Sequence, residues 1–259
     1  MLSKSENLSK FYFGIPLRSF ASSKDWGRVC RLFSATLNAV LNQTSPSFEV
    51  IVACHEIPET KIGDDPRVTY LVSQRKAPEN VPDQMMDKHY KRRMIAAEVR
   101  RRGGGYIMAV DADDLVSRRI VEFVEKNQHP FGYIVGRGYE LDLQSKSIRS
   151  APRFDKLCGS SGIFKFASTE LPPSADADSE FLSDSYGNHS KWRETSIELK
   201  RPLLDLPFPA VLYVTNSGEN HSIATGNVGW RRKLVRAVTP RTTDLSKFDV
   251  EFMISQLLS

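Results

Sequence analysis

The stretch YIMAVDADD, at residues 106–114, indicates the fold of this chain more clearly than any other. It begins with the apolar run YIMAV, which has the length and composition of a strand buried on both faces. Three acidic residues follow closely, Asp111, Asp113 and Asp114. Ligands of open α/β sheets bind outside the carboxyl ends of the strands, so we expect these carboxylates to face a binding crevice.

Strand and helix patterns alternate on both sides of this run. Asp25, Ser22 or Ser23 would cap the first helix, three consecutive glycines at 103–105 end the second, and Ser117 would cap the third. This order predicts an α/β fold with parallel crossovers. The predicted elements are strands at residues 9–17, 48–54, 68–72 and 106–110, and helices at 25–43, 83–102 and from 117 onward.

The second half of the chain has a different pattern. Residues 133–143 and 147–150 flank a short polar turn and predict a hairpin, and residues 210–215 predict a further strand. An acidic loop at 171–184 and a short basic helix at 230–238 are also expected. Because no Gly/Ser-rich linker divides the halves, we expect them to share one sheet. The chain is then a single domain over residues 1–259, with a ligand-binding half at 10–125 and a second half at 126–240.

The composition is that of a globular protein. Hydrophobic residues make up 40% and charged residues 26% of the 259 residues, which excludes disordered, collagen-like and coiled-coil chains. Three widely spaced cysteines fit neither a disulfide framework nor a zinc site. The first ten residues are polar, and no apolar run approaches the roughly 20 residues of a membrane span, so we expect a cytoplasmic protein.

Basic residues outnumber acidic ones by 36 to 31, and several are clustered, as at 91–93 and 100–102. Such clusters suit an anionic partner: a nucleoside diphosphate, an anionic lipid or a nucleic acid. For any single cluster, a solvated helix face is the more common explanation. Since the sequence has no RNP-like, KH-like or zinc-finger pattern, we expect no nucleic-acid partner.

The spacing of Asp111 and Asp113 suggests a metal site. On an extended backbone, residues two apart point to the same side, where two carboxylates suit Mg²⁺ or Mn²⁺. Such a cation would neutralise charge that develops on a diphosphate leaving group. The alternative is that these aspartates only cap a helix or form a turn.

Three segments resemble the nucleotide-sugar domain of family 2 glycosyltransferases: FGIPLRS at 13–19, TLNAVLNQTSPSFEVIVACHE at 36–56, and GYIMAVDADDLVSRR at 105–119. The resemblance covers residues 10–125, and GENHS at 218–222 is compatible with it. It implies a GT-A-like (Rossmann-like) fold, a mostly parallel open sheet flanked by helices, with an acceptor-side C-terminal half. It also implies Mn²⁺ or Mg²⁺, a nucleoside-diphosphate sugar donor (a UDP-sugar first) and a hexosyltransferase-like activity. The acceptor hydroxyl would belong to a glycan or a lipid-linked molecule in surface glycan or polysaccharide synthesis.

The resemblance also implies site residues. Glu56 departs from the family pattern, because it stands after Cys54 and His55 instead of directly at the end of the strand. Asp87 and Lys91 lie on one helix face and would contact ribose or phosphate, unless they are an ordinary surface pair. The implied nucleotide-sugar-binding residues are Pro16, Arg18, Glu56, Asp87, Lys91, Asp111 and Ala112, and the implied metal ligands are Asp111, Asp113 and His221.

Inverting transfer needs a general base for the acceptor hydroxyl, which the family supplies as Asp or Glu from its second half. Asp184 is the first candidate here and Glu180 the second, with Asp178 and His189 as further alternatives. The usual Glu-Asp pair of the family is absent in that spelling. Without such a base, a retaining mechanism becomes the alternative, and the sequence does not separate the two.

Two other kinds of function compete with this interpretation. A phosphohydrolase of the haloacid-dehalogenase type also places DxD after an apolar strand, but its pattern has Thr or Val where Leu115 stands. A non-catalytic basic module that binds nucleic acid or a membrane surface is the second alternative. The amphipathic residues 230–238 would also suit peripheral contact with anionic lipid if the acceptor is lipid-linked.

Overall fold

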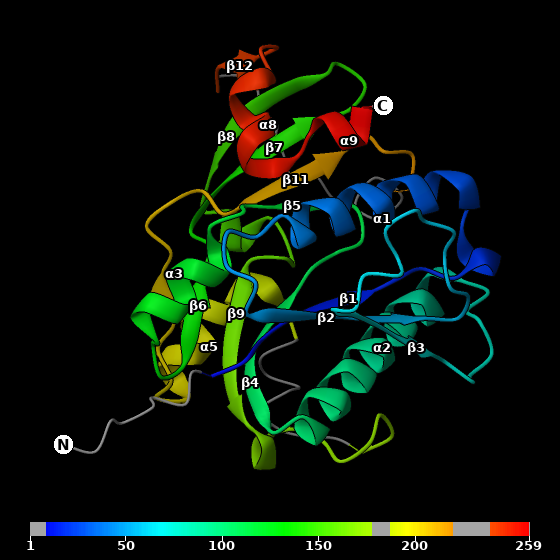
Figure 1. Cartoon of the computed structure of the whole chain (residues 1–259), viewed down its shortest axis with the longest axis vertical. Helices are drawn as coiled ribbons and strands as arrows, with labels where there is room; N and C mark the ends of the chain where they lie inside the picture. Colours follow the sequence, from blue (N-terminus) through cyan, green and yellow to red (C-terminus); the bar gives the residue numbers. More distant parts are fainter. Residues whose placement is uncertain (1–8, 178–186, 220–238, 259) are drawn as a thin grey trace.

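A sheet of seven strands forms the centre of the computed structural model, which describes residues 9–177, 187–219 and 239–258 (Figure 1). Four adjacent strands pair in parallel, β1 with β2 and β4, and β2 with β3, and at the far edge β10 pairs in parallel with β6. β9 runs antiparallel between β4 and β6. In the order in which they lie side by side, the strands are β10 (Leu204–Asp205), β6 (Gly132–Ile134), β9 (Gly162–Ala167), β4 (Gly104–Ala109), β1 (Phe11–Pro16), β2 (Phe48–Cys54) and β3 (Val68–Val72).

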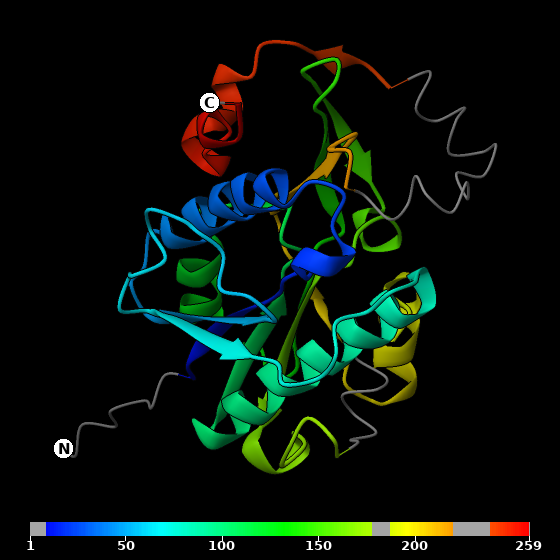
Figure 2. The same ribbon diagram turned by 90° about the vertical axis from the view of Figure 1, so that its right-hand side faces the viewer.

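Helices cover both faces of this sheet. Figures 1 and 2 show α1 (Trp26–Leu41) and α2 (Val81–Arg101) on opposite sides of it. Successive residues of a strand point to opposite faces. Accordingly, Phe13 packs in the cluster that includes α1, while its neighbour Tyr12 packs in the cluster that includes α2. The remaining described helices of this region are α3 (Ile120–Asn127) and α5 (Trp192–Glu198), with short 3-10 turns at Phe20–Ser22, Phe154–Lys156, Ser168–Glu170 and His189–Lys191.

A glycine allows α2 to approach the sheet closely. A Cβ atom at Gly14, in β1, would lie 2.8 Å from Cγ2 of Ile95 on α2. That separation is shorter than ordinary van der Waals contact, so no larger residue fits without movement of the helix. Gly14 therefore allows the second half of α2 to pack closely against β1.

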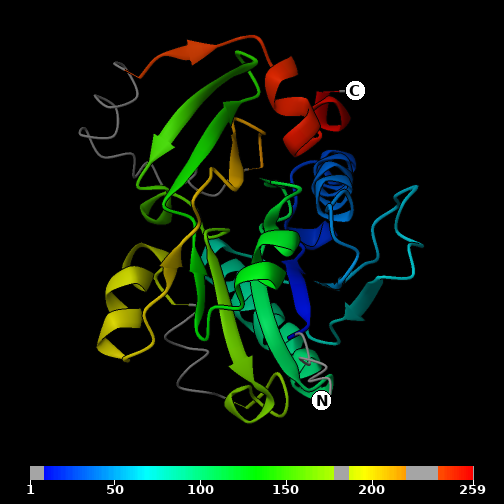
Figure 3. The same ribbon diagram turned by 60° about the vertical axis from the view of Figure 1, so that its left-hand side comes forward.

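A second sheet lies beside the central one (Figure 3). Tyr139 of this sheet packs against Phe248 and Phe252 of α8 (Ser246–Phe252), at ring separations of 4.9 and 5.9 Å. The last described helix, α9 (Ser255–Leu258), packs beside α1. The strands of this sheet, in spatial order, are β12 (Arg241–Thr242), β8 (Ser147–Pro152), β7 (Arg137–Asp142), β11 (Val211–Thr215) and β5 (Leu115–Val116).

The α/β class is confirmed: a mostly parallel central sheet is flanked by helices. The predicted hairpin is also confirmed as β7 and β8, although residues 132–134 form the separate strand β6 of the central sheet. The expectation of one shared sheet is only half right. Strands β6, β9 and β10 of the second half join the central sheet, whereas β7, β8, β11 and β12 form a sheet with β5.

Of the two predicted helix caps, Asp25 and Ser117, the first is confirmed and the second is wrong. Asp25 caps α1 as predicted, since its side chain accepts a hydrogen bond from the Arg28 N–H. Ser117 does not cap α3, which begins at Ile120 after Arg119. The Ser117 hydroxyl oxygen instead accepts a hydrogen bond from the Arg119 N–H at 3.2 Å, before the helix starts. The same hydroxyl donates a hydrogen bond to the carboxylate of Glu251. The predicted basic helix at 230–238 lies outside the described residues.

All three cysteines, Cys30, Cys54 and Cys158, are buried free thiols, which agrees with the absence of a disulfide framework. Within residues 9–177, 187–219 and 239–258, no helix has the length and apolar character needed to span a bilayer.

Candidate functional site

A cleft with a volume of about 340 Å³ lies at the carboxyl ends of β1 and β4, beside α2. Its volume is within the range of small-ligand sites. It is the crevice that the sequence predicts beyond the YIMAV strand. Its lining includes seven residues that the sequence nominates: Pro16, Arg18, Asp87, Lys91, Asp111, Ala112 and Asp113.

The acidic motif forms a turn, so the expectation of an extended backbone is wrong. The backbone N–H of Asp114 donates to the carbonyl oxygen of Asp111 at 3.0 Å, which closes the turn. The Asp114 side chain is fully buried and accepts hydrogen bonds from the Ser160 hydroxyl at 2.5 Å and the Cys158 thiol at 3.0 Å. Asp114 thus anchors the turn in the protein interior, while Asp111 and Asp113 line the cleft.

Asp111 lies opposite two basic residues of α2. Its Oδ1 atom is 2.6 Å from Nζ of Lys88 and 3.9 Å from Nη2 of Arg92. Burial acts to raise the pKa of Asp111, but the charges of Lys88 and Arg92 outweigh it and hold this pKa below its ordinary value. Asp111 is therefore ionised at neutral pH and compensated by α2.

The positive charges around the cleft compensate the carboxyl groups of Asp113 and Asp114 less than that of Asp111. Burial, followed by the negative charge of Asp111, raises the pKa of Asp113 to about 6. Burial and the charges of Asp113 and Asp111 raise the pKa of Asp114 well above its ordinary value. A cation bound in the cleft would relieve the repulsion between Asp111 and Asp113.

Asp87 and Lys91 form a buried pair, so the surface-pair alternative is wrong. Nζ of Lys91 is 2.7 Å from Oδ2 of Asp87 and 2.7 Å from the carbonyl oxygen of Leu17. The Lys91 side chain is only 1% exposed, and burial lowers its pKa against the opposing effect of Asp87. These bonds hold α2 to the residue that follows β1. On the other side of Asp87, Nε2 of His55 lies 3.7 Å from Oδ1.

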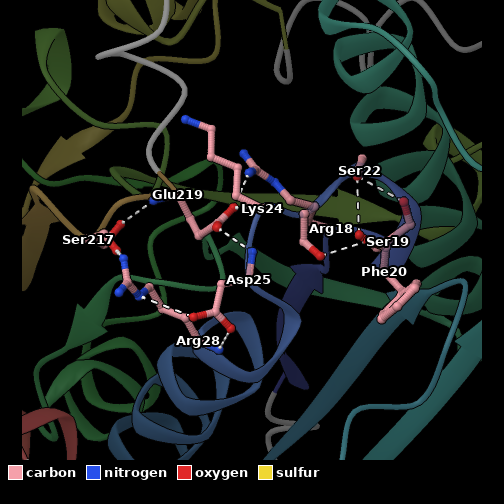
Figure 4. A network of polar contacts seen from close by, with 10 residues as sticks. Arg18, Ser19, Phe20, Ser22, Lys24, Asp25, Arg28, Ser217 and Glu219 are labelled. Carbon is pink, nitrogen blue, oxygen red and sulfur yellow. Dashed lines mark hydrogen bonds and ion pairs between the residues drawn. The ribbon is translucent and has the colours of Figure 1, made fainter.

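Arg18 is held by an acidic residue from the far end of the chain (Figure 4). Its Nη1 atom donates to Oε2 of Glu219 at 2.6 Å. The Glu219 carboxylate also accepts from the backbone N–H groups of Asp25 at 3.0 Å and Lys24 at 3.4 Å, at the start of α1. Glu219 is 8% exposed and lines the same cleft. It therefore joins the end of β11 to the loop after β1.

The chain next to Glu219 has a conformation that glycine favours. Gly218 has a φ of +84°, and a Cβ atom there would lie 2.2 Å from Nη1 of Arg28. The same Nη1 donates to the Ser217 carbonyl oxygen at 3.3 Å (Figure 4). The GENHS segment was nominated for His221, whereas Glu219 of the same segment was not predicted as a site residue. An acidic residue in the loop that follows the predicted strand at 210–215 was the available signal.

Of the other nominated residues that the structure describes, Glu56 lies outside the cleft and His189 lines it. Glu56 is exposed and is not part of the cleft lining; it accepts a hydrogen bond from the Phe20 N–H at 3.0 Å. His189, the least favoured candidate for a general base, lies in a 3-10 turn and lines the cleft. The candidates that lie outside the described residues are Asp178, Glu180, Asp184 and His221.

Two basic residues of α2 were not predicted as site residues. Lys88 and Arg92 line the cleft and face Asp111, whereas the nominated Lys91 is bonded within the protein. The separation of Lys88 and Arg92 by four positions places them on one face of a helix, and this spacing was the available signal.

No protein-family model matches the chain, and no curated protein is significantly similar to it in sequence. Solved structures do show a likeness. The crystal structure of S. aureus TarS is 12% identical, with a TM-score of 0.43, over 80% of this chain and 37% of that one. This chain thus spans little more than a third of that protein. A protein proposed to be a nucleotide-diphospho-sugar transferase, from Desulfovibrio desulfuricans G20, is 9% identical with a TM-score of 0.34, over 88% of this chain and 95% of that one.

Proposed function

We propose that this chain is a glycosyltransferase of the family 2 type, which transfers a sugar from a nucleoside-diphosphate sugar to an acceptor hydroxyl. The observation that carries the proposal is the cleft at the carboxyl ends of β1 and β4. There two carboxylates, Asp111 and Asp113, face basic residues of α2 and Arg18 within one cavity of about 340 Å³. Such a cavity offers separate partners for a cation and for phosphate oxygens.

The described residues are compatible with a divalent cation. Asp111 and Asp113 would hold it, since Mg²⁺ and Mn²⁺ take one or two carboxylates and complete their shell with phosphate oxygens and water. The raised pKa of Asp113, about 6, is the property expected of a buried carboxylate that a cation would stabilise. In the described part of the chain, no three His, Cys, Asp or Glu side chains gather as a metal site. When bound, the cation would neutralise charge on the diphosphate leaving group.

The chain's own residues would position the donor. Pro16 and Ala112 line the cleft at the ends of β1 and β4, where the nucleoside and ribose would lie. Arg18, which Glu219 holds in place, would face the donor from the loop after β1. The ion pair of Asp87 and Lys91 would hold α2 in its position beside the cleft, where the donor would bind.

A general base would take the proton of the acceptor hydroxyl as this oxygen attacks the anomeric carbon. His189 lines the cleft, and a neutral imidazole can accept this proton at physiological pH. Asp184 and Glu180 remain the acidic candidates. Our proposed acceptor is a glycan or a lipid-linked molecule of surface polysaccharide synthesis, and a lipid-linked acceptor would require peripheral contact with a membrane.

A thermal-shift panel tests the donor proposal. UDP, GDP, CDP and dTDP are each added with and without Mn²⁺, with inorganic phosphate as the control anion. We expect one nucleotide, UDP first, to stabilise the protein more than the others and more strongly with Mn²⁺. At a concentration of 100 times Kd the stabilisation is about 2.7 kcal/mol. The proposal is wrong if none of the four stabilises the protein under either condition.

A further inference from the structure

Two neighbouring serines that precede β9, Ser160 and Ser161, are both fully buried but differ in their hydrogen bonds. The Ser160 hydroxyl accepts a hydrogen bond from the Asp111 N–H at 2.9 Å and donates one to Oδ2 of Asp114 at 2.5 Å. The Ser161 hydroxyl has no hydrogen-bond partner among the residues that the structure describes. Ser160 is thus bonded to both ends of the acidic turn at residues 111–114, while its neighbour is not.

The pairing of β4 with β9 explains why Ser160 meets Asp111. The two strands lie side by side and antiparallel, with Met108 opposite Ile163 (Figure 1). Three positions further along β4 and three positions back from Ile163, the same register places Asp111 opposite Ser160. The acidic turn and the segment before β9 therefore meet at one edge of the sheet.

The segment that carries Ser160 is fixed at both ends through its backbone. At one end, the Cys158 N–H donates to the carbonyl oxygen of Phe154 at 3.1 Å. At the other end, the Val135 N–H donates to the carbonyl oxygen of Ser161 at 2.8 Å. Within the described part of the chain, Ser160 is not among the residues that line the cleft. It therefore contacts the acidic turn from behind the wall of the cleft.

On these observations we propose that Ser160 is a positioning residue, which fixes the backbone of Asp111 and thereby the carboxylate that would hold the cation. The inference rests on the proposed function, and it assigns to Ser160 no contact with donor, acceptor or cation. Loss of the hydroxyl would remove the acceptor of the Asp111 N–H and a donor to Asp114 in a buried place, which is costly. The turn would shift to recover these bonds, and Asp111 would move with it.

The chemistry of a hydroxyl suits this role, because it donates one hydrogen bond and accepts others at a single atom. Asp111 presents an N–H and Asp114 presents a carboxylate oxygen, so both functions are used. The Cys158 thiol donates to the same Oδ2 atom of Asp114 at 3.0 Å, but among the described residues it has no hydrogen bond to Asp111. The thiol therefore cannot replace the Ser160 hydroxyl at Asp111.

Amide hydrogen exchange, measured by NMR on the full chain without metal or nucleotide, tests the bond itself. We expect the Asp111 amide to be protected in the wild type. Ser160→Ala should accelerate its exchange by about tenfold, the scale of one lost hydrogen bond. Ser161→Ala is the matched control and should leave this amide protected. Ser160→Cys keeps the shape with a weaker hydrogen-bonding group, should give an intermediate rate, and replaces Ser160→Ala if that variant does not fold.

Isothermal titration calorimetry with Mn²⁺ alone tests the consequence for the cation. Ser160→Ala should weaken Mn²⁺ binding by about tenfold, a loss typical of removing a group that supports a metal ligand. Ser161→Ala should bind Mn²⁺ as the wild type does. A second control, Glu140→Ala, removes a buried carboxylate from β7 of the second sheet. It should lose stability and keep its affinity for Mn²⁺, which separates a loss of position at Asp111 from a general loss of stability.

The inference is overturned if the Asp111 amide exchanges equally fast in the wild type and in Ser160→Ala. It is also overturned if Ser160→Ala and Ser161→Ala do not differ in Mn²⁺ binding, or if Glu140→Ala loses as much affinity as Ser160→Ala. Loss of both protection and Mn²⁺ affinity in Ser160→Ala, with no stabilisation by any of the four nucleotides, would support the role of Ser160 and contradict the proposed donor class. A clear nucleotide preference with unchanged Mn²⁺ affinity in Ser160→Ala would do the reverse.

Discussion

The cleft and the second sheet both contain paired charges, but the pairs are placed differently. In the second sheet, Glu140 of β7 lies directly opposite Arg149 of β8, and their side chains are 5% and 8% exposed. In the cleft, Asp111 and Lys88 are 25% and 30% exposed at the mouth of a cavity. An ion pair therefore indicates a binding site only where a ligand can reach it.

The largest effect that we predict concerns the cleft carboxylates. Asp113→Asn and Asp111→Asn should each reduce sugar transfer by at least about a hundredfold, because each removes charge that stabilises the reacting diphosphate complex. Transfer is measured with the nucleotide sugar that the thermal-shift panel selects. Asp64→Asn, an equivalent change at an exposed position, serves as the control and should leave transfer unchanged. Full Mn²⁺-dependent transfer in both cleft variants would contradict the proposed site.

In the second sheet, the corresponding change should affect stability and leave binding intact. Glu140→Ala leaves Arg149 as a buried charge without this carboxylate, and should lower the free energy of unfolding by about 3 kcal/mol. Urea denaturation measures this loss, and nucleotide titration should show an unchanged Kd. Replacing both residues with methionine should recover much of the stability. A change in Kd larger than the unfolded fraction of the variant accounts for would show that the second sheet and the cleft are coupled.

Glu219 connects the two regions, so its removal should have an intermediate effect. Glu219→Ala removes the partner of Arg18 and of two backbone N–H groups at the start of α1. We expect the free energy of unfolding to fall by about 2 kcal/mol, the scale of hydrogen bonds to a charged group. Chemical denaturation measures the change, with Glu219→Gln as the matched variant that keeps an acceptor. If Glu219→Ala is as stable as the wild type, this connection does not hold the regions together.

The smallest effect concerns pH. Burial first, and then the charge of Lys91, lower the pKa of the enclosed His55 below 6.5. The unfolded chain therefore binds more protons than the folded chain just below pH 6.5. The contribution of His55 to the free energy of unfolding is fully present well above pH 6.5. It should decline as the pH falls through this range, by at most about 1.4 kcal/mol per pH unit.

Denaturation midpoints measured over roughly one pH unit on each side of the ordinary histidine pKa give the slope of stability against pH. His55→Gln should reduce this slope. A slope that is unchanged in His55→Gln would contradict the assignment to this residue.

The sequence determined the secondary structure of the first half and the position of the acidic motif. Apolar runs of strand length became β1 to β4, and the helical pattern that Asp25 caps became α1. These features depend on which faces are buried and on which residues end an element, and neighbouring residues encode both. The same reasoning put Asp111 and Asp113 at the carboxyl end of a strand, where the cleft lies.

The tertiary structure alone decided which charges meet. Composition places both Lys88 and Lys91 on the helix α2, but only its packing against β1 encloses Lys91 and leaves Lys88 in the cleft. Arg18 and Glu219 are 201 positions apart, so no local pattern could pair them. The division of the later strands between two sheets has the same cause. A strand's pattern records the burial of its faces, while its hydrogen-bonded neighbour is chosen by segments far away in the chain.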